Sequence, residues 1–147
     1  MFEGFKFKVE IAEITGKGLG VIARESIPAG ALIWTLAEGR YRIMNEPEFY
    51  ERLNTLSREE QRHLLIHGYG WGDKVIEVWD GAEYVNHSAE NNMTASDDPF
   101  SCYAARDISP GEELCDDYRS YDVPEYLARL CAEWGILTSR EITERYV

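Results

Sequence analysis

Hydrophobic and charged residues alternate over residues 5–14, with Phe5, Phe7, Val9 and Ile11 on one side. Such alternation is typical of a strand with one buried face. Short hydrophobic runs bounded by glycine or proline predict further strands at residues 21–23, 31–34, 75–79 and 100–104. The chain is therefore expected to be rich in short strands.

A helical pattern replaces this alternation between residues 45 and 70. Asn45 stands directly before a glutamate and a proline, which is typical of a helix start. Ser57 and Glu60 have the spacing of a capping box, in which each side chain accepts a hydrogen bond from the other residue's backbone. We predict two short helices here, the second ending at Gly68.

A second helical region is predicted in the tail. Asp122 is expected to cap a helix that ends at Gly135, and Thr138 and Glu141 could cap a last short helix. Hydrophobic residues recur at helical spacing in the first of these helices: Tyr126, Leu127, Leu130, Cys131 and Trp134.

Many short strands, a helical insert and a helical tail make a β-rich α+β domain. We divide the single domain into N-terminal strands (5–44), the helical insert (45–70), a C-terminal core (71–121) and the helical tail (122–147). Residues 23–32 and 105–114 read alike, each as strand, turn with proline and glycine, strand. Two copies are too few for a solenoid, so we interpret them as one corner used twice.

The charge of the 147-residue chain is acidic, with 15 Lys+Arg against 27 Asp+Glu and a formal net charge of −12. Proteins that bind nucleic acid through its phosphates carry basic faces, so direct nucleic-acid binding is not expected. An acidic surface attracts cationic partners, although it could equally serve solubility alone. The charge thus allows a basic protein or peptide as partner.

The cysteines and histidines do not predict a metal site. The three cysteines are widely spaced, which argues against a disulfide framework or a zinc cluster. His63 and His67 have ligand spacing on a helix, but no third ligand is near, and His63 is expected to face solvent. No apolar run reaches the ~18 residues of a membrane span, and the N-terminus lacks the form of a signal peptide. An intracellular protein is expected, with cytoplasm and nucleus both open.

The most suggestive stretch runs from Tyr84 to Asn92. Tyr84 and Val85 are expected to end a buried strand, and the polar residues after them are typical of a turn. Polar side chains at the end of a strand are well placed to meet a ligand. Taken alone, the stretch is more simply interpreted as an ordinary turn with a satisfied histidine.

Three separated motifs resemble, in the right order, those of the SET-domain protein-lysine methyltransferase family. Gly18-Leu-Gly20 resembles the family's glycine motif, and Asn86-His-Ser88 matches its Asn-His-Ser motif. Residues 111–114, followed by Asp117 and Tyr118, match the last motif, which ends in the active-site tyrosine. A lone glycine motif is a weak signal, but the ordered set spans residues 16–118 and is specific.

The resemblance implies a SET-domain fold of small curled sheets with a pseudoknot, a helical insert and a C-terminal helix. In the pseudoknot, the segment with the last motif passes under the loop that carries residues 86–88. Such threading departs from the general avoidance of crossing connections, so periodicity could not have predicted it.

The resemblance also implies S-adenosylmethionine as the cofactor. Lys17, Gly18 and Leu19 would lie along its methionine end through backbone groups, because glycine allows close approach. Asn86 would hold its amino-acid part, and His87 would contact adenine mostly through backbone. No metal is implied.

The residues around the reacting amine are carried over in the same way. Tyr118 would be the catalytic tyrosine, with Tyr121 as the competing candidate, and Tyr84, Tyr121 and Asp116 would lie beside the substrate. Asp116 stands where the family often has a Phe or Tyr that limits the number of methyl groups, so the methylation state is not predicted. Tyr118 could instead be a buried aromatic bonded to backbone.

The tail departs from the family pattern. Many members close the lysine channel with a zinc-binding cysteine segment, and none follows Tyr118 here. The tail helix is expected to close the site instead, with Trp134 stacking on adenine, or else to pack in the core.

Two functions therefore follow from the sequence. The first is methyl transfer from S-adenosylmethionine to a lysine amine of a basic protein or peptide, with histone-like proteins among the candidates. The alternative is an inactive SET-like module that binds basic tails. A monomer and a homodimer are both open.

Overall fold

The computed structural model describes residues 1–97 and 100–145. Its strands are β1 (Val9–Ile14), β2 (Gly18–Ala23), β3 (Leu32–Thr35), β4 (Tyr41–Met44), β5 (Tyr69–Trp71), β6 (Lys74–Val78), β7 (Asn86–His87), β8 (Met93–Ala95), β9 (Ser101–Ala104) and β10 (Glu113–Asp116). Its helices are α1 (Glu46–Asn54), α2 (Arg58–His67), α3 (Glu125–Trp134) and α4 (Ser139–Arg145), with 3-10 turns η1 (Ala82–Tyr84) and η2 (Tyr118–Ser120).

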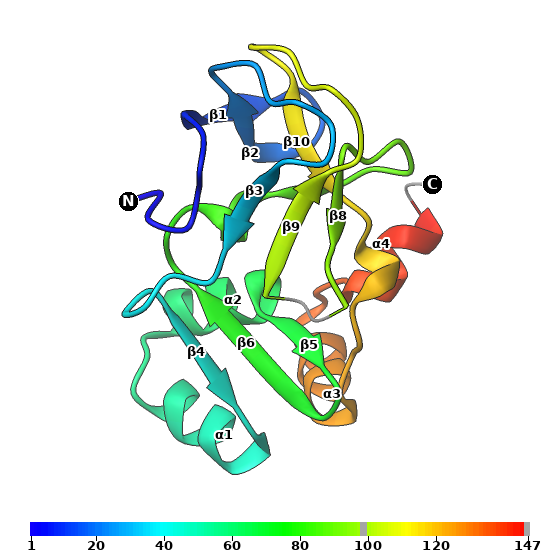
Figure 1. The fold of residues 1–147 in the computed structure, drawn as a ribbon. Helices are drawn as coiled ribbons and strands as arrows, with labels where there is room; N and C mark the ends of the chain where they lie inside the picture. Colours follow the sequence, from blue (N-terminus) through cyan, green and yellow to red (C-terminus); the bar gives the residue numbers. More distant parts are fainter. Residues whose placement is uncertain (98–99, 146–147) are drawn as a thin grey trace.

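The strands form three small sheets, with the orders β1-β2-β10-β7, β3-β9-β8 and β4-β6-β5. Figure 1 shows the first at the top of the view, the second in the middle and the third below. The described chain is thus a strand-rich α+β fold of small sheets, as predicted.

Two predicted strands are shorter than expected. The alternation over residues 5–14 does place one side half-buried, but β1 begins only at Val9, and Phe5 makes an isolated bridge with Trp34. Tyr84 does not end a strand, because residues 82–84 form η1 behind Gly81, whose φ is 103°. The prediction of a buried strand at Tyr84 and Val85 is therefore wrong, and only Asn86 and His87 pair, as β7.

The two similar corners pair with each other. The Ile27 N–H donates to the Ile108 carbonyl at 2.9 Å, and the Ile108 N–H donates to the Ile27 carbonyl at 2.8 Å. Both isoleucines are fully buried in the first hydrophobic core, to which all three sheets contribute residues. The internal similarity is therefore architectural, since each corner supplies the partner of the other.

The last motif lies against the Asn-His-Ser stretch. β10 pairs in parallel with β7, with Cys115 opposite Asn86 and Asp116 opposite His87. Buried Asn92, in the loop between β7 and β8, ties that loop to β10, because its side chain donates to the Glu113 carbonyl and accepts from the Cys115 N–H. The two segments named in the predicted crossing therefore lie side by side.

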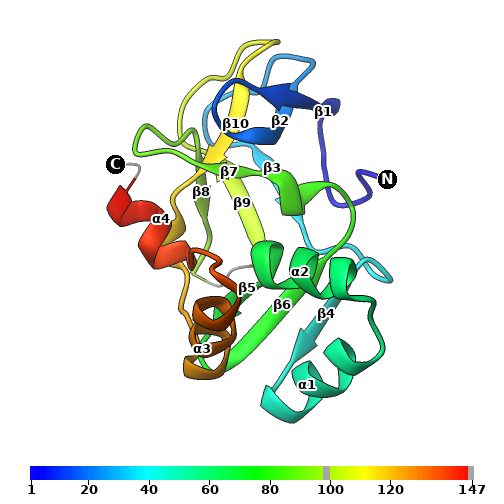
Figure 2. The same cartoon turned by 180° about the vertical axis from the view of Figure 1, so that it is seen from behind.

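Helices α1, α2 and α3 cover the third sheet on one side and enclose a second core (Figure 2). Asn45 and Ser57 form the predicted capping boxes of α1 and α2. Asp122 does not cap α3, whose N-cap is Pro124. Its carboxylate instead accepts a hydrogen bond from the Gly72 N–H at 2.7 Å. Within the described chain no helix has both the length and the apolar character needed to cross a bilayer.

Candidate active site

Two cavities meet beneath the C-terminal helices. The larger, of about 680 Å³, lies between the β1–β2 turn, the loop around β7 and the segment before α4. The smaller, of about 100 Å³, is lined by residues of the second and third sheets, η2 and the tail. Six residues line both cavities: Ile66, His67, Glu83, Tyr118, Leu137 and Ile142.

The glycine motif forms one wall of the larger cavity. Gly18 opens β2 with a φ of 83°, a backbone conformation that favours glycine, and Lys17 and Leu19 on either side line the cavity. Gly20 is needed for close packing, because a Cβ there would lie 2.6 Å from Ile14 Cγ1 and 2.9 Å from Asn86 Nδ2. The motif therefore presents backbone to the cavity and lets Asn86 approach β2.

The Asn86 side chain is held in place beside the glycine motif by two hydrogen bonds. Its Nδ2 donates to the Leu19 carbonyl at 3.0 Å and to Glu113 Oε2 at 2.8 Å. Lys17 Nζ reaches the same carboxylate at 3.0 Å. Burial alone would lower the pKa of Lys17, but its contacts with Glu113 and Cys115 raise it overall, so the ammonium stays charged. Both amide hydrogens of Asn86 are thus used, and its carbonyl oxygen remains an acceptor for a ligand.

His87 positions Tyr118 through its ring. Its Nδ1 accepts a hydrogen bond from the Tyr118 backbone N–H at 3.1 Å, so the nitrogen must be unprotonated. Burial lowers the pKa of His87, which favours that neutral form. The sequence predicted a backbone contact with adenine for this residue, and the structure adds the link to Tyr118.

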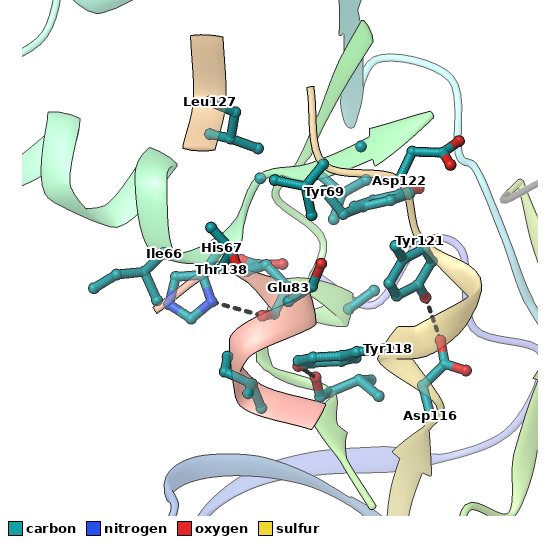
Figure 3. A pocket seen from close by; sticks show the side chains of 18 of the residues that line it. Ile66, His67, Tyr69, Glu83, Asp116, Tyr118, Tyr121, Asp122, Leu127 and Thr138 are labelled. Carbon is teal, nitrogen blue, oxygen red and sulfur yellow. Dashed lines mark hydrogen bonds between the residues drawn. The ribbon is translucent and has the colours of Figure 1, made fainter. Parts of the chain in front are cut away.

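Tyr118 lies where the two cavities join. Its hydroxyl donates to the Val85 carbonyl at 2.5 Å, which ties η2 to the loop before β7 (Figure 3). Burial and the nearby Asp116 carboxylate raise the pKa of Tyr118 above its usual range. The phenol is therefore neutral at physiological pH, and it is a polar group that lines both cavities.

The smaller cavity contains a buried carboxylate. Asp116 is 3% exposed and accepts hydrogen bonds from the Tyr121 hydroxyl and from the Asp117 N–H. Tyr121 in turn packs against Tyr69, with ring centroids 5.0 Å apart. Burial raises the pKa of Asp116, although the bond from Tyr121 opposes the shift. Much of the remaining wall is apolar, including Trp34, Val78, Met93 and Leu127.

His67 forms part of the partition between the cavities. Its Nδ1 lies 2.8 Å from the Glu83 carbonyl, and its ring packs against Tyr84. Burial, together with the nearby His63, lowers the pKa of His67 to about 4. The ring is therefore neutral near pH 7 and donates Nδ1–H to the carbonyl.

The structure brings together most of the residues predicted from sequence. The larger cavity is lined by Lys17, Leu19, Tyr84, Asn86, His87 and Tyr118, with Gly18 between the first two. The smaller is lined by Asp116, Tyr118 and Tyr121. Tyr84, predicted to lie beside the substrate, lines the larger cavity and not the smaller one.

Trp134 is not brought to either cavity. The Arg58 guanidinium lies 4.4 Å from the centre of its ring, and its indole packs on the second core. Tyr126 and Leu127 are likewise buried in that core. The core-packing alternative therefore describes α3 better than adenine stacking does.

The tail helix α3 does reach the smaller cavity, through Leu127 and Cys131. Further lining residues, in α4 and the segment before it, were not assigned from sequence: Leu137, Thr138, Ser139 and Ile142. The capping box of Thr138 and Glu141 predicted the helix itself, but it did not indicate which part of the protein that helix would contact. Ile66 and His67, at the end of α2, were also missed as lining residues.

The chemistry of the two cavities differs. The larger has the size of a small-molecule site and combines apolar walls with an amide, an imidazole and exposed backbone. The smaller suits a thin apolar stem with a polar tip. Among residues 1–97 and 100–145, no cluster of three His, Cys, Asp or Glu side chains is arranged to hold a metal ion.

Comparison with known proteins agrees with this geometry. Residues 18–119 match the family model of the SET domain. The rat (Rattus norvegicus) histone-lysine N-methyltransferase SETMAR is 24% identical over 130 residues, which cover 78% of the chain and 40% of SETMAR. The chain thus spans well under half of that relative.

Two solved structures share the fold at low sequence identity. The methyltransferase domain of human SETMAR has a TM-score of 0.55 and 21% identity, covering 84% of this chain and 47% of that one. The Neurospora histone lysine methyltransferase DIM-5 has a TM-score of 0.54 and 20% identity, covering 78% and 53%.

Proposed function

Because the chain belongs to the SET-domain family, we propose that it transfers a methyl group from S-adenosylmethionine to the side-chain amine of lysine in a basic protein or peptide. The observation that carries this proposal is the meeting of the two cavities at Tyr118. A methyl donor and an amine approach from opposite sides in an in-line displacement. A site with two separate compartments and one shared polar group suits that geometry.

The larger cavity fits the cofactor on its own chemistry. The free carbonyl oxygen of Asn86 and the exposed backbone around Gly18 suit the charged amino-acid end. The apolar side chains of Leu19, Ile136 and Ile142 suit the nucleoside. When bound, S-adenosylmethionine supplies a methyl group on a positively charged sulfur.

The chain's residues would then act by position and by polarity. The smaller cavity strips water from the lysine amine, which lowers its pKa and favours the neutral, nucleophilic form. The Tyr118 hydroxyl and the Val85 carbonyl lie together at the junction, where they can orient the amine and the moving methyl. Since Tyr118 stays protonated, it serves as a hydrogen-bonding group and not as a base.

The substrate class follows from the acidic surface and the shape of the smaller cavity. A formal net charge of −12 favours encounter with a cationic chain, and histone-like proteins are candidates because of the relatives named above. The binding-only alternative gains no support from the described site, which retains the tyrosine at the junction of both cavities.

The test is methyl transfer from labelled S-adenosylmethionine to an array of lysine peptides, each paired with an arginine analogue. Label on lysine peptides alone is the expected result. Calorimetry with S-adenosylmethionine should show binding by the wild-type protein and weak binding by Asn86→Ala with an intact fold. Cofactor binding without transfer to any peptide would contradict the proposed activity, and no binding at all would contradict the cofactor.

A further inference from the structure

Asp116 is a buried carboxylate without a cation. It ends β10 at the wall of the smaller cavity, is 3% exposed, and forms no ion pair with any side chain in the described part of the chain. An unpaired buried charge is costly, and proteins retain one mainly where it pairs with a ligand or does chemistry.

The surroundings of Asp116 offer its carboxylate no cation and leave it with unused hydrogen-bond acceptor sites. The charged and titratable groups that face it are Cys102 from β9, Tyr118 and Tyr121 from the η2 segment, and its neighbour Asp117. None of these is a cation. Its two oxygens accept one bond from Tyr121 and one from the Asp117 N–H, whereas a carboxylate offers about four acceptor sites.

We propose that Asp116 binds the incoming lysine ammonium and takes its proton, so that the neutral amine forms inside the cavity. This inference rests on the proposed methyl transfer. One N–H bond of the ammonium breaks, one O–H bond forms on the Asp116 carboxyl group, and the nitrogen keeps the electron pair with which it attacks the methyl group. No other reactant is needed.

The low polarity of the cavity favours this transfer. Burial destabilises both the carboxylate and the ammonium relative to their neutral forms, so their proton affinities approach one another. Burial already raises the pKa of Asp116, and the Tyr121 hydroxyl keeps it from rising further. Figure 3 shows the Asp116 carboxyl group beside the Tyr121 hydroxyl, with the Tyr118 ring nearby.

The first test is the pH dependence of methyl transfer by Asp116→Asn, which keeps the shape and removes the base. At about pH 7 its rate on a peptide that the wild type methylates should fall roughly a hundredfold. The deficit should shrink about tenfold per pH unit and close at pH ~9, because the neutral fraction of free lysine grows about tenfold per pH unit below its pKa of about 10.4. An equal deficit at every pH, or no deficit at pH 7, would overturn the inference.

Two variants separate proton transfer from a structural effect. Asp73→Asn makes the same charge change on a side chain that is 88% exposed and should leave the profile unchanged. Tyr121→Phe removes the hydrogen bond that lowers the pKa of Asp116, so the acidic limb of its pH–rate profile should move to higher pH. An acidic limb that stays in place argues against Asp116 as the titrating group.

A binding measurement gives a readout that needs no turnover. Wild type should bind the lysine peptide at least about tenfold more tightly than its norleucine analogue, and Asp116→Asn should lose this preference. Equal wild-type affinities would overturn the inference. If wild type binds S-adenosylmethionine yet methylates no peptide, the proposed function fails first and this inference falls with it. A wild type that methylates lysine while Asp116→Asn behaves identically refutes only the role of Asp116.

Discussion

Replacing Tyr118 by phenylalanine removes a single hydroxyl from the junction of the two cavities. The hydroxyl donates to the Val85 carbonyl. The centroid of the ring lies 5.4 Å from the centroid of the His87 ring and 5.9 Å from that of the Tyr121 ring. These ring contacts survive in Tyr118→Phe. The variant therefore isolates the polar contribution from the packing.

We expect Tyr118→Phe to change the rate of methyl transfer strongly, the free energy of unfolding slightly and the cofactor affinity very little. Loss of one polar group that acts in the transition state costs ~3 kcal/mol of barrier, or roughly a hundredfold in rate. The Val85 carbonyl also loses its donor, which should lower the free energy of unfolding by about 1 kcal/mol. Cofactor affinity should change little, because Asn86 and the glycine motif are untouched.

The assay is single-turnover methyl transfer with the cofactor saturating, compared among wild type, Tyr118→Phe and Tyr103→Phe. Tyr103 is 39% exposed on β9 and lines neither cavity, so its variant should match wild type. A Tyr118→Phe protein as fast as wild type would refute the assignment. A large loss of cofactor affinity instead would mean that the phenol belongs to the cofactor compartment.

Three further predictions follow. Gly20→Ala should lower the free energy of unfolding by about 1–3 kcal/mol and weaken cofactor binding, because its Cβ would lie 2.6 Å from Ile14 Cγ1; thermal melts and calorimetry test both. Stability should fall as the pH drops from about 6.5 to about 4, because the unfolded chain protonates His67 more readily than the folded protein does. The drop is on the order of 3 kcal/mol and should shrink in His67→Asn, as urea unfolding at several pH values will show. Peptide KM should rise with salt while kcat holds, since surface charges are screened over ~8 Å at physiological ionic strength; a salt-independent KM would leave the net charge of −12 as a solubility feature.

The sequence predicted those parts of the fold that depend on interactions between residues close together along the chain. The capping boxes at Asn45, Ser57 and Thr138 each satisfy helix ends through residues three apart, so the sequence contains the whole interaction. The three motifs likewise predicted the walls of the larger cavity. Tyr84 shows the limit, because Gly81 turns the chain into η1 just where the hydrophobic pattern suggested a strand.

The covering of the site could not be predicted, because it depends on contacts between distant segments. Trp134 and Ile142 are both apolar residues on helices of the tail, and neither spacing nor composition says which one meets the cavity. The structure resolves this through the second core, which takes the inner face of α3 and leaves α4 to pack against η2. Figure 1 shows α4 beside that turn.

β10 explains how one short strand serves both compartments. Successive side chains of a strand point to opposite faces. Glu113 and Cys115 both contact Lys17, on the side of the larger cavity. Leu114 and Asp116 point the other way, into the first core and the smaller cavity. The strand is therefore a partition between the larger cavity, proposed for the cofactor, and the smaller cavity, proposed for the substrate, and Tyr118 follows the end of the strand. A carboxylate at position 116 faces the smaller cavity, and the same residue one position earlier would face the larger one.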